Sequence, residues 1–289
     1  MFLGEGGDLT LFMTGKKLRP STEPMYSGGN IIDFPITTGY DSVEYTDFIS
    51  SHLFNSKNIL IYQNFHDGHF SGCFAPSKRY SPRPSLSWGI RKNYYTFIMF
   101  VREKWKWKNG RRKQIYSLSC DENLGFGVFF MENYGTRQSI VKNLLDIRKK
   151  WEEGFKITAC ASRGSKFYII MTKGTNEYKG RQTWFTRASW QGVSNSIQKY
   201  SKEGNAITGI CYSTGLGKYF VVMTETPQGQ AYKRFDNNTA RGNWVQEKYK
   251  EGFHPTIIFK DPTDKKTLMV MTKDENRSSY ICRDSFKVA

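Results

Sequence analysis

One short stretch, Arg102 to Lys113 (REKWKWKNGRRK), concentrates the side chains most able to bind another molecule. Interleaved cations and indoles can bind nucleic acid through phosphate contacts and base stacking. Most charge runs instead form a solvated or protein-facing surface, and we favour that interpretation here. The stretch holds one glutamate, two tryptophans and seven cations, which are Arg102, Lys104, Lys106, Lys108, Arg111, Arg112 and Lys113.

The spacing within this stretch predicts the element that carries it. Lysine and tryptophan alternate from Lys104 to Trp107, which predicts a strand with lysines on one face and indoles on the other. Asn109-Gly110 is a hairpin-turn dipeptide, after which the next cations return alongside. The predicted partner-binding surface includes a second basic group, which consists of Arg148, Lys149 and Lys150.

Three residues of metal-ligand type lie close together in the sequence, namely His66, His69 and Cys73. Imidazole and thiolate groups could together bind zinc. The intervening Asp67-Gly68, however, is typical of a turn, so we interpret the imidazoles as exposed turn residues. We therefore expect no metal and no cofactor.

No catalytic arrangement is indicated by the remaining polar residues. The four histidines of the chain give no Ser-His-Asp grouping that could be argued from sequence. Glu153, Glu203 and Glu251 recur at one place in a repeat, which indicates a corner hydrogen bond rather than an acid–base pair. We expect no enzyme activity and no small-molecule substrate.

The composition favours a folded protein with an acidic partner. The 289 residues carry a formal net charge of +17, and 16% of them are aromatic, which argues against disorder. A charge of this size favours nucleic acid, an anionic membrane or an acidic protein surface as the partner. The longest apolar run, about Tyr94 to Val101, is far too short to span a membrane, so we expect no membrane partner.

Cysteine usage predicts a reducing compartment. Five cysteines occur without a CxxC pair, so a disulfide framework is not expected. Cys120, Cys160 and Cys211 fall in corresponding strands of successive repeats and are predicted to be core residues. The first residues contain Glu5 and Asp8 and no basic segment, unlike a signal peptide. We expect an intracellular protein of the cytoplasm or cytoskeleton, with the nucleus as the alternative.

An internal repeat dominates the rest of the chain. Trp151 to Gly174 contains two apolar runs of strand length separated by a polar turn. Corresponding phrases occupy Gly110 to Glu132, Gly204 to Thr224 and Gly252 to Thr272, and their leading glycines, with Gly154, are 44, 50 and 48 residues apart. A period of about 45 residues with several strands per unit is typical of propeller blades.

We therefore predict an all-β, β-propeller-like fold of six or seven blades, with a β-sandwich or an open β-repeat array as the alternative. One domain is expected to span residues 1–289. Its best-defined repeats are 105–150, 151–200, 201–248 and 249–289, and divergent units occupy 1–104. An orphan strand near the N-terminus and an incomplete C-terminal unit are what a ring closed by its two ends would show.

Several weaker segments complete this prediction. Second strands are expected at Asp8–Gly15, Lys57–Gln63 and Tyr94–Val101, and Ala75–Ser87 is expected to be a loop. Third strands are expected at Gln182–Arg187 and Gln230–Arg234. The segments that fit either a strand or a short helical turn are Leu144–Trp151, Val193–Tyr200 and Trp244–Tyr249.

The repeat resembles a known family through the phrase W-x-x-G-[FY]-x-I-T, followed by a turn and F-x-x-x-M-[ST]-K-G-T. It looks like the β-repeat region found C-terminal to the kinase domain of plant casein-kinase-one-like nuclear kinases, an uncharacterised repeat domain family. The resemblance covers about residue 105 to the end and implies an accessory interaction domain. The kinase itself is absent, because no HRD, DFG or VAIK motif occurs. The matching residues are Trp151, Gly154, Phe155, Ile157, Thr158, Met171, Lys173, Gly174 and Thr175.

Three functions are compatible with these features. The favoured one is a non-catalytic scaffold that docks through basic corners onto an acidic assembly such as a tubulin-like filament. The second is a nucleic-acid-associated module of a ribonucleoprotein or chromatin complex. The third, an enzyme with a site in a propeller channel, lacks candidate catalytic residues.

Overall fold

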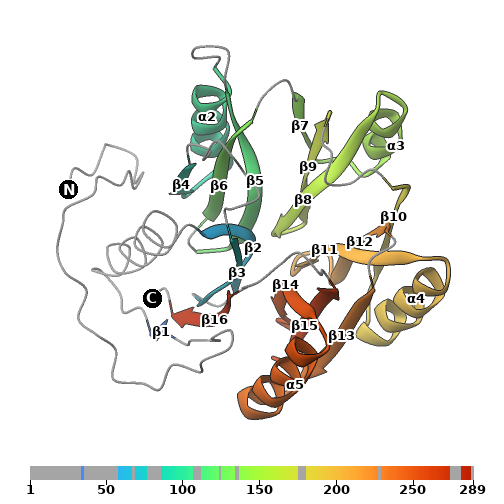
Figure 1. Ribbon diagram of the computed structural model, residues 1–289. Coiled ribbons are helices and arrows are strands. Elements are labelled where there is room, and N and C mark those ends of the chain that lie inside the picture. The colour runs from blue at the N-terminus through green and yellow to red at the C-terminus, as the bar shows by residue number, and fades with distance from the viewer. Residues whose placement is uncertain are drawn as a thin grey trace.

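The computed structural model describes ten stretches of the chain. They are residues 34–35, 58–66, 69–76, 86–106, 112–123, 125–133, 137–174, 180–226, 229–273 and 281–287. Within them the fold is mostly β, with four three-stranded antiparallel sheets, one four-stranded sheet and a helix beside each three-stranded sheet. Figure 1 shows these helices, α2 to α5, spaced around the outside of the sheets.

The second described unit illustrates the repeat. Its elements are β7 (Arg137–Val141), α3 (Leu145–Glu152), β8 (Phe155–Arg163) and β9 (Lys166–Lys173), and its sheet has the order β7-β9-β8. The edge strand is thus followed by a helix, and a β-hairpin completes the sheet. A residue of β8, Thr158, is bulged out of the pairing with β9 between Ile157 and Ala159.

Three other units repeat this order of strand, helix, strand and strand. The first consists of β4 (Leu86–Arg91), α2 (Tyr94–Lys104), β5 (Arg112–Asp121) and β6 (Gly125–Asn133). The third consists of β10 (Gln182–Arg187), α4 (Trp190–Lys202), β11 (Asn205–Ser213) and β12 (Lys218–Glu225). The fourth consists of β13 (Gln230–Phe235), α5 (Asn238–Lys250), β14 (Phe253–Lys260) and β15 (Thr267–Lys273).

The remaining sheet joins segments from the two ends of the chain. Its order is β1-β16-β3-β2, formed by β1 (Phe34–Pro35), β16 (Ile281–Lys287), β3 (His69–Pro76) and β2 (Asn58–His66). β16 pairs with β3 in antiparallel fashion, just as β13 pairs with β15. A strand from the end of the chain therefore occupies the place that the edge strand has in the other units.

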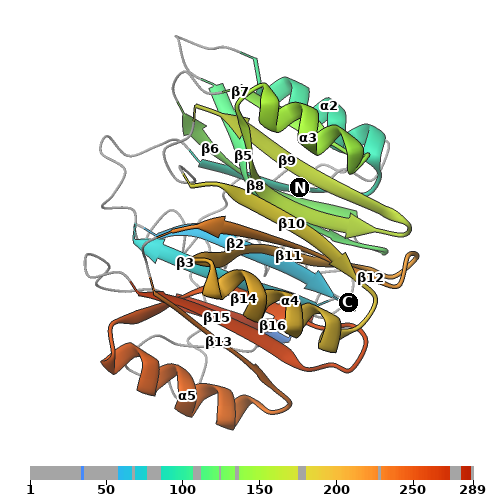
Figure 2. The same ribbon diagram turned by 90° about the vertical axis from the view of Figure 1, so that its right-hand side faces the viewer.

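Neighbouring sheets contact one another through their hairpin strands. β2 contacts β5, β5 contacts β8, β8 contacts β11, β11 contacts β14, and β14 contacts β2. Seen from the side, the strands of neighbouring sheets have roughly aligned axes (Figure 2). Helices α2, α3 and α4 share a buried cluster with the next sheet as well as their own, and Ile147 of α3 lies in one such cluster with Phe155 of β8 and Phe220 of β12. The core therefore extends from sheet to sheet.

The repeated strand pairs are confirmed. The apolar runs that begin at Phe167, Tyr219 and Leu268 lie in β9, β12 and β15 and are buried. Gln182–Arg187 and Gln230–Arg234 are strands as predicted. They pair with β12 and β15, which are the second strands of the hairpins that come after them in the chain. The three segments left open between strand and helix lie in α3, α4 and α5.

Tyr94–Val101 is helix α2, so its prediction as a strand was wrong. The Asn93 side chain accepts a hydrogen bond from the Thr96 backbone N–H (2.9 Å), which fixes the start of the helix. Phe97, Phe100 and Val101 are buried at helical spacing. Aromatic composition had favoured a strand, whereas capping and burial on one face stabilise a helix.

The predicted number of blades is unconfirmed. Lys57–Gln63 falls mostly in β2, which has a bulge after Leu60. Similar bulges occur in β5 and β8, which are the first strands of their hairpins, so this segment corresponds to a first strand and not to the predicted second strand. Asp8–Gly15 and most of Ala75–Ser87 lie outside the described residues.

Candidate functional site

The predicted basic corners are the C-terminal ends of the helices. Each described helix carries two basic residues in its last turn, where the partial negative charge of the helix dipole favours cations. These residues are Arg102 and Lys104 in α2, Lys149 and Lys150 in α3, Lys199 and Lys202 in α4, and Lys248 and Lys250 in α5. The same position in each unit is therefore basic.

The glycine that follows three of these helices explains the sequence marker. Gly154, Gly204 and Gly252 have φ values of 83°, 81° and 83°, a left-handed conformation that favours glycine. Each ends its helix and turns the chain into a hairpin strand. The regular spacing of these three glycines is thus a spacing of helix ends.

The predicted alternation across Lys104–Trp107 was wrong for the part that the structure describes. Arg102 and Lys104 lie in the last turn of α2, and Trp105 is its C-cap, half-buried against the core beside that helix. Lys106 follows and is exposed. Lys108 and Arg111 lie outside the described residues, and Arg112 and Lys113 begin β5. A helix end, rather than a two-faced strand, presents this charge.

The second predicted group lies on α3. Arg148 pairs with Glu152 (3.5 Å), and Lys150 donates a hydrogen bond to Glu153 (2.7 Å), which lowers the pKa of Glu153. Lys149 is exposed and forms no ion pair with any described residue. Glu251 is likewise bonded to Lys248 (2.7 Å), so the corner hydrogen bond is confirmed for Glu153 and Glu251.

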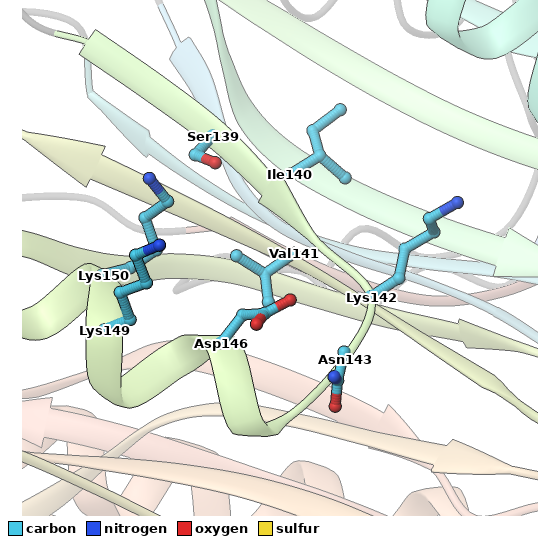
Figure 3. Close-up of a pocket in the computed structure, with 8 residues that line it drawn as sticks. All are labelled: Ser139, Ile140, Val141, Lys142, Asn143, Asp146, Lys149 and Lys150. Atoms are coloured by element: carbon cyan, nitrogen blue, oxygen red, sulfur yellow. The ribbon is translucent and has the colours of Figure 1, made fainter.

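A groove of about 420 Å³ runs between β7 and α3. Its helix side presents Asp146, Lys149 and Lys150, which share one face because they are three and four residues apart. Figure 3 shows the ammonium groups of Lys149 and Lys150 side by side, with the Asp146 carboxylate beside Val141 and Lys142 on the opposite side. The lining residues are Ser139, Ile140, Val141, Lys142, Asn143, Asp146, Lys149 and Lys150.

The groove coincides with the shortest helix of the repeat. Sixteen residues separate Gln138 from Gly154, whereas 22 separate Gln182 from Gly204 and Gln230 from Gly252. α3 accordingly has 8 residues, compared with 13 in α4 and in α5. Five fewer residues shorten a helix by about 7.5 Å. We infer that the shorter helix leaves part of β7 uncovered.

The sequence did not indicate two of the four charged residues that line this groove. Lys142 and Asp146 were not predicted, although the sixteen-residue spacing was available as a signal. The Lys142 ammonium lies 4.3 Å from the centre of the Tyr94 ring, which holds it near the end of β7. Lys149 and Lys150 were predicted as partner-binding residues, which stays a prediction, and the structure places them with Lys142 around one groove.

Other repeated polar residues are used in joining sheets. The Gln182 side chain accepts from the Ile157 backbone N–H (2.7 Å) and donates to its carbonyl (2.9 Å), and it also donates to Thr224 (3.1 Å). Ile157 immediately precedes the bulge in β8, so the glutamine satisfies backbone groups that the bulge removes from the ladder. Gln138 and Gln230 do the same for Ile115 and Ile207.

Among the described residues, neither the cysteines nor the histidines form a candidate functional site. Cys120, Cys160 and Cys211 are buried free thiols, as predicted, and burial raises the pKa of Cys120 and Cys211 well above the usual value. His66 and His69 are opposite positions in the backbone register of β2 and β3. In the part of the chain that the structure describes, no group of three or more histidine, cysteine, aspartate or glutamate residues is placed to hold a metal ion.

Comparison with known proteins adds no identity. No protein-family model matches the chain, and no curated protein matches it. Of the helices described here, none has the length and apolar character needed to cross a membrane.

Proposed function

We propose that the protein is a non-catalytic scaffold that docks through its basic helix ends onto an acidic protein surface of a large assembly, such as a tubulin-like filament. The observation that carries this proposal is the repeated set of exposed helix-end cations that form no ion pair with any described residue. They are Arg102, Lys106, Lys149, Lys199, Lys202 and Lys250.

The proposed scaffold is a closed ring of five units of propeller type. The circuit of contacts from β2 through β5, β8, β11 and β14 back to β2 supports this arrangement, and so does the position of β16 beside β3. A rigid ring holds its helix ends at fixed spacing. Several weak charge contacts can then act together on a repetitive acidic lattice.

The proposal gives the chain no catalytic role. The repeated glutamines and threonines are engaged in hydrogen bonds: Gln182, for example, bonds to Ile157 of the neighbouring sheet and to Thr224 of its own sheet. The resemblance of the repeat to an accessory region beside a kinase is consistent with an interaction domain. An intracellular, reducing compartment is proposed as well, on the support of three buried free cysteines.

Co-sedimentation with microtubules over a salt series tests this function, with RNA and duplex DNA as competing ligands. The combined variant Arg102→Glu, Lys106→Glu and Lys149→Glu is expected to weaken filament binding about tenfold or more at low salt. A matched control reverses Lys166, Lys218 and Lys233, exposed cations on strands rather than at helix ends.

Equal losses for the two triple variants would show that total charge, not the helix ends, determines binding. Tighter binding to RNA or DNA than to filaments, with the steep salt dependence of released counterions, would favour the nucleic-acid module instead. Absence of filament binding by the unmodified protein would overturn the proposal.

A further inference from the structure

The groove between β7 and α3 combines two features that suit one kind of ligand. β7 is an edge strand, since its sheet has the order β7-β9-β8 and no described strand pairs with its other side. Every second residue of an edge strand directs its N–H and C=O away from the sheet. An extended peptide can satisfy these groups by adding a strand.

The charge of the groove restricts which peptide would bind. Three ammonium groups and one carboxylate line it, and Lys142 and Lys149 make no ion pair within the described stretches. Lys150 is shared with Glu153, so its charge is partly neutralised. An acidic segment would pair its carboxylates with Lys149 and with Lys142, whose ammonium lies over the Tyr94 ring, whereas a basic segment would be repelled.

The size of the groove matches a short segment. Its volume of about 420 Å³ lies within the range of about 300–1,000 Å³ that ligand sites occupy. β7 has five residues, a length that spans about 17 Å as an extended strand. A segment of five or six residues would cover the strand.

We propose that this groove binds an extended acidic segment of a partner protein, which adds as a strand to the free edge of β7 with its carboxylates toward Lys142, Lys149 and Lys150. This inference rests on the proposed scaffold function and names the part of an acidic partner that is recognised. The other helix ends then contribute unspecific attraction, and the second unit selects the partner.

Fluorescence anisotropy with a labelled six-residue peptide of alternating glutamate and valine tests the charge requirement. Lys149→Glu should weaken binding about tenfold. Lys199→Glu is the matched control, because it makes the same charge change in the last turn of α4, whose unit has the longer helix. Equal effects of the two variants would overturn the groove as the site.

A variant that should bind the peptide more tightly distinguishes an electrostatic effect from misfolding. Asp146→Asn removes the only carboxylate in the groove lining and should strengthen binding of the same peptide several-fold. A variant that failed to fold could not bind more tightly. Unchanged or weaker binding by folded Asp146→Asn protein would contradict the assigned electrostatics.

Two N-methylated forms of the peptide test strand addition itself. In a strand, alternate amides face the neighbouring strand, so methyl groups on one alternate set should abolish binding while the other set leaves it intact. Equal binding of both forms would rule out pairing with β7. An RNA hexamer that displaces the peptide and binds more tightly, with the same sensitivity to Lys149→Glu, would reassign the groove to nucleic acid.

These outcomes are separable from those of the filament assay. If the protein binds filaments but its affinity for the peptide is unchanged by Lys149→Glu, the groove assignment alone is wrong. Loss of all affinity for filaments removes the proposed function.

Discussion

Asp261 is fully buried, and four groups from two units donate hydrogen bonds to its side chain. Its carboxylate accepts from the Tyr219 hydroxyl (2.6 Å), the Arg234 guanidinium (2.6 Å), and the backbone N–H (2.9 Å) and hydroxyl (2.7 Å) of Thr263. Arg234 also lies 4.1 Å from the centre of the Trp190 ring. Since α4 and β12 belong to one unit and β13 and β14 to the next, this cluster joins them.

We expect Arg234→Met to lower the free energy of unfolding by about 3–5 kcal/mol, because it leaves the Asp261 carboxylate buried without its cation. Methionine retains an apolar stem against Trp190. Asp264→Asn is the control: it removes the second carboxylate on Arg234, which is 40% exposed, and should cost less than about 1 kcal/mol. Urea unfolding followed by circular dichroism measures both, and similar losses would refute the buried-charge explanation.

Tyr219, which is buried, and Tyr249, which is half-buried, predict a loss of stability at alkaline pH. Burial raises the pKa of Tyr219 and Tyr249 well above the ordinary 10.0, and the hydrogen bond to Asp261 raises that of Tyr219 further. On raising the pH, the unfolded chain therefore loses these protons before the folded chain does. The contribution of the two protonated hydroxyls to the free energy of unfolding is complete below pH 10.0 and declines as the pH rises above it.

Urea unfolding at pH values on either side of 10.0, together with phenolate absorbance, tests this expectation. Tyr249→Phe should reduce the decline, because phenylalanine has no proton to lose. Phenolate formation by these two residues near their ordinary pKa in a protein that retains its native circular dichroism would contradict it.

Helix α5 has one glycine in its interior and another just after its C-terminal end, and the two positions have opposite requirements. Gly242 lies inside the helix, where an added Cβ would meet no atom within 4 Å. Gly252 follows the helix end with a φ of 83°. The same substitution should therefore act in opposite directions at the two positions.

Gly242→Ala is expected to raise the free energy of unfolding by about 0.5–1 kcal/mol, because alanine favours the helix interior. Gly252→Ala should lower it by about 1 kcal/mol, because a side chain is strained in the left-handed region. Thermal unfolding of the two variants provides the comparison. A stabilising Gly252→Ala would show that the turn does not adopt this conformation.

Elements with a strong local pattern were predictable, and those set by their surroundings were not. The strands at Phe167 and Leu268 are continuous apolar runs, buried and enclosed between polar residues, a pattern that favours a buried strand. Tyr94–Val101 has similar composition but is a helix, since packing between two sheets and the Asn93 cap outweigh its propensity. The groove required knowledge that α3 is short relative to the sheet beside it, which composition does not contain.

The sheet formed by β2, β3 and β16 is the feature of the whole molecule most open to direct test. Cys282 of β16 stands directly opposite Cys73 of β3 in the antiparallel register. Directly opposed residues have Cβ atoms about 4.5–5.5 Å apart, close to the separation in a disulfide. The chain therefore contains a natural pair of cysteines for testing the proposed ring closure.

Mild oxidation should cross-link Cys73 to Cys282 in the folded protein and not in urea, as detected by mobility on a non-reducing gel and by mass spectrometry of the linked peptides. Cys73→Ser is the control and should abolish the cross-link. Ready alkylation of both thiols under native conditions without any cross-link would count against the β16–β3 pairing.

The pairing of β16 with β3 also has a consequence during biosynthesis. The ribosome completes β3 at Pro76 but reaches Lys287, the last residue of its partner strand, 211 residues later. At ordinary translation rates this interval lasts roughly 10–40 s. Throughout it the nascent chain carries an unpaired strand edge, which is prone to aggregate. Chaperone protection of that early hairpin should therefore matter more for the yield of this protein than for one whose sheets are each completed locally.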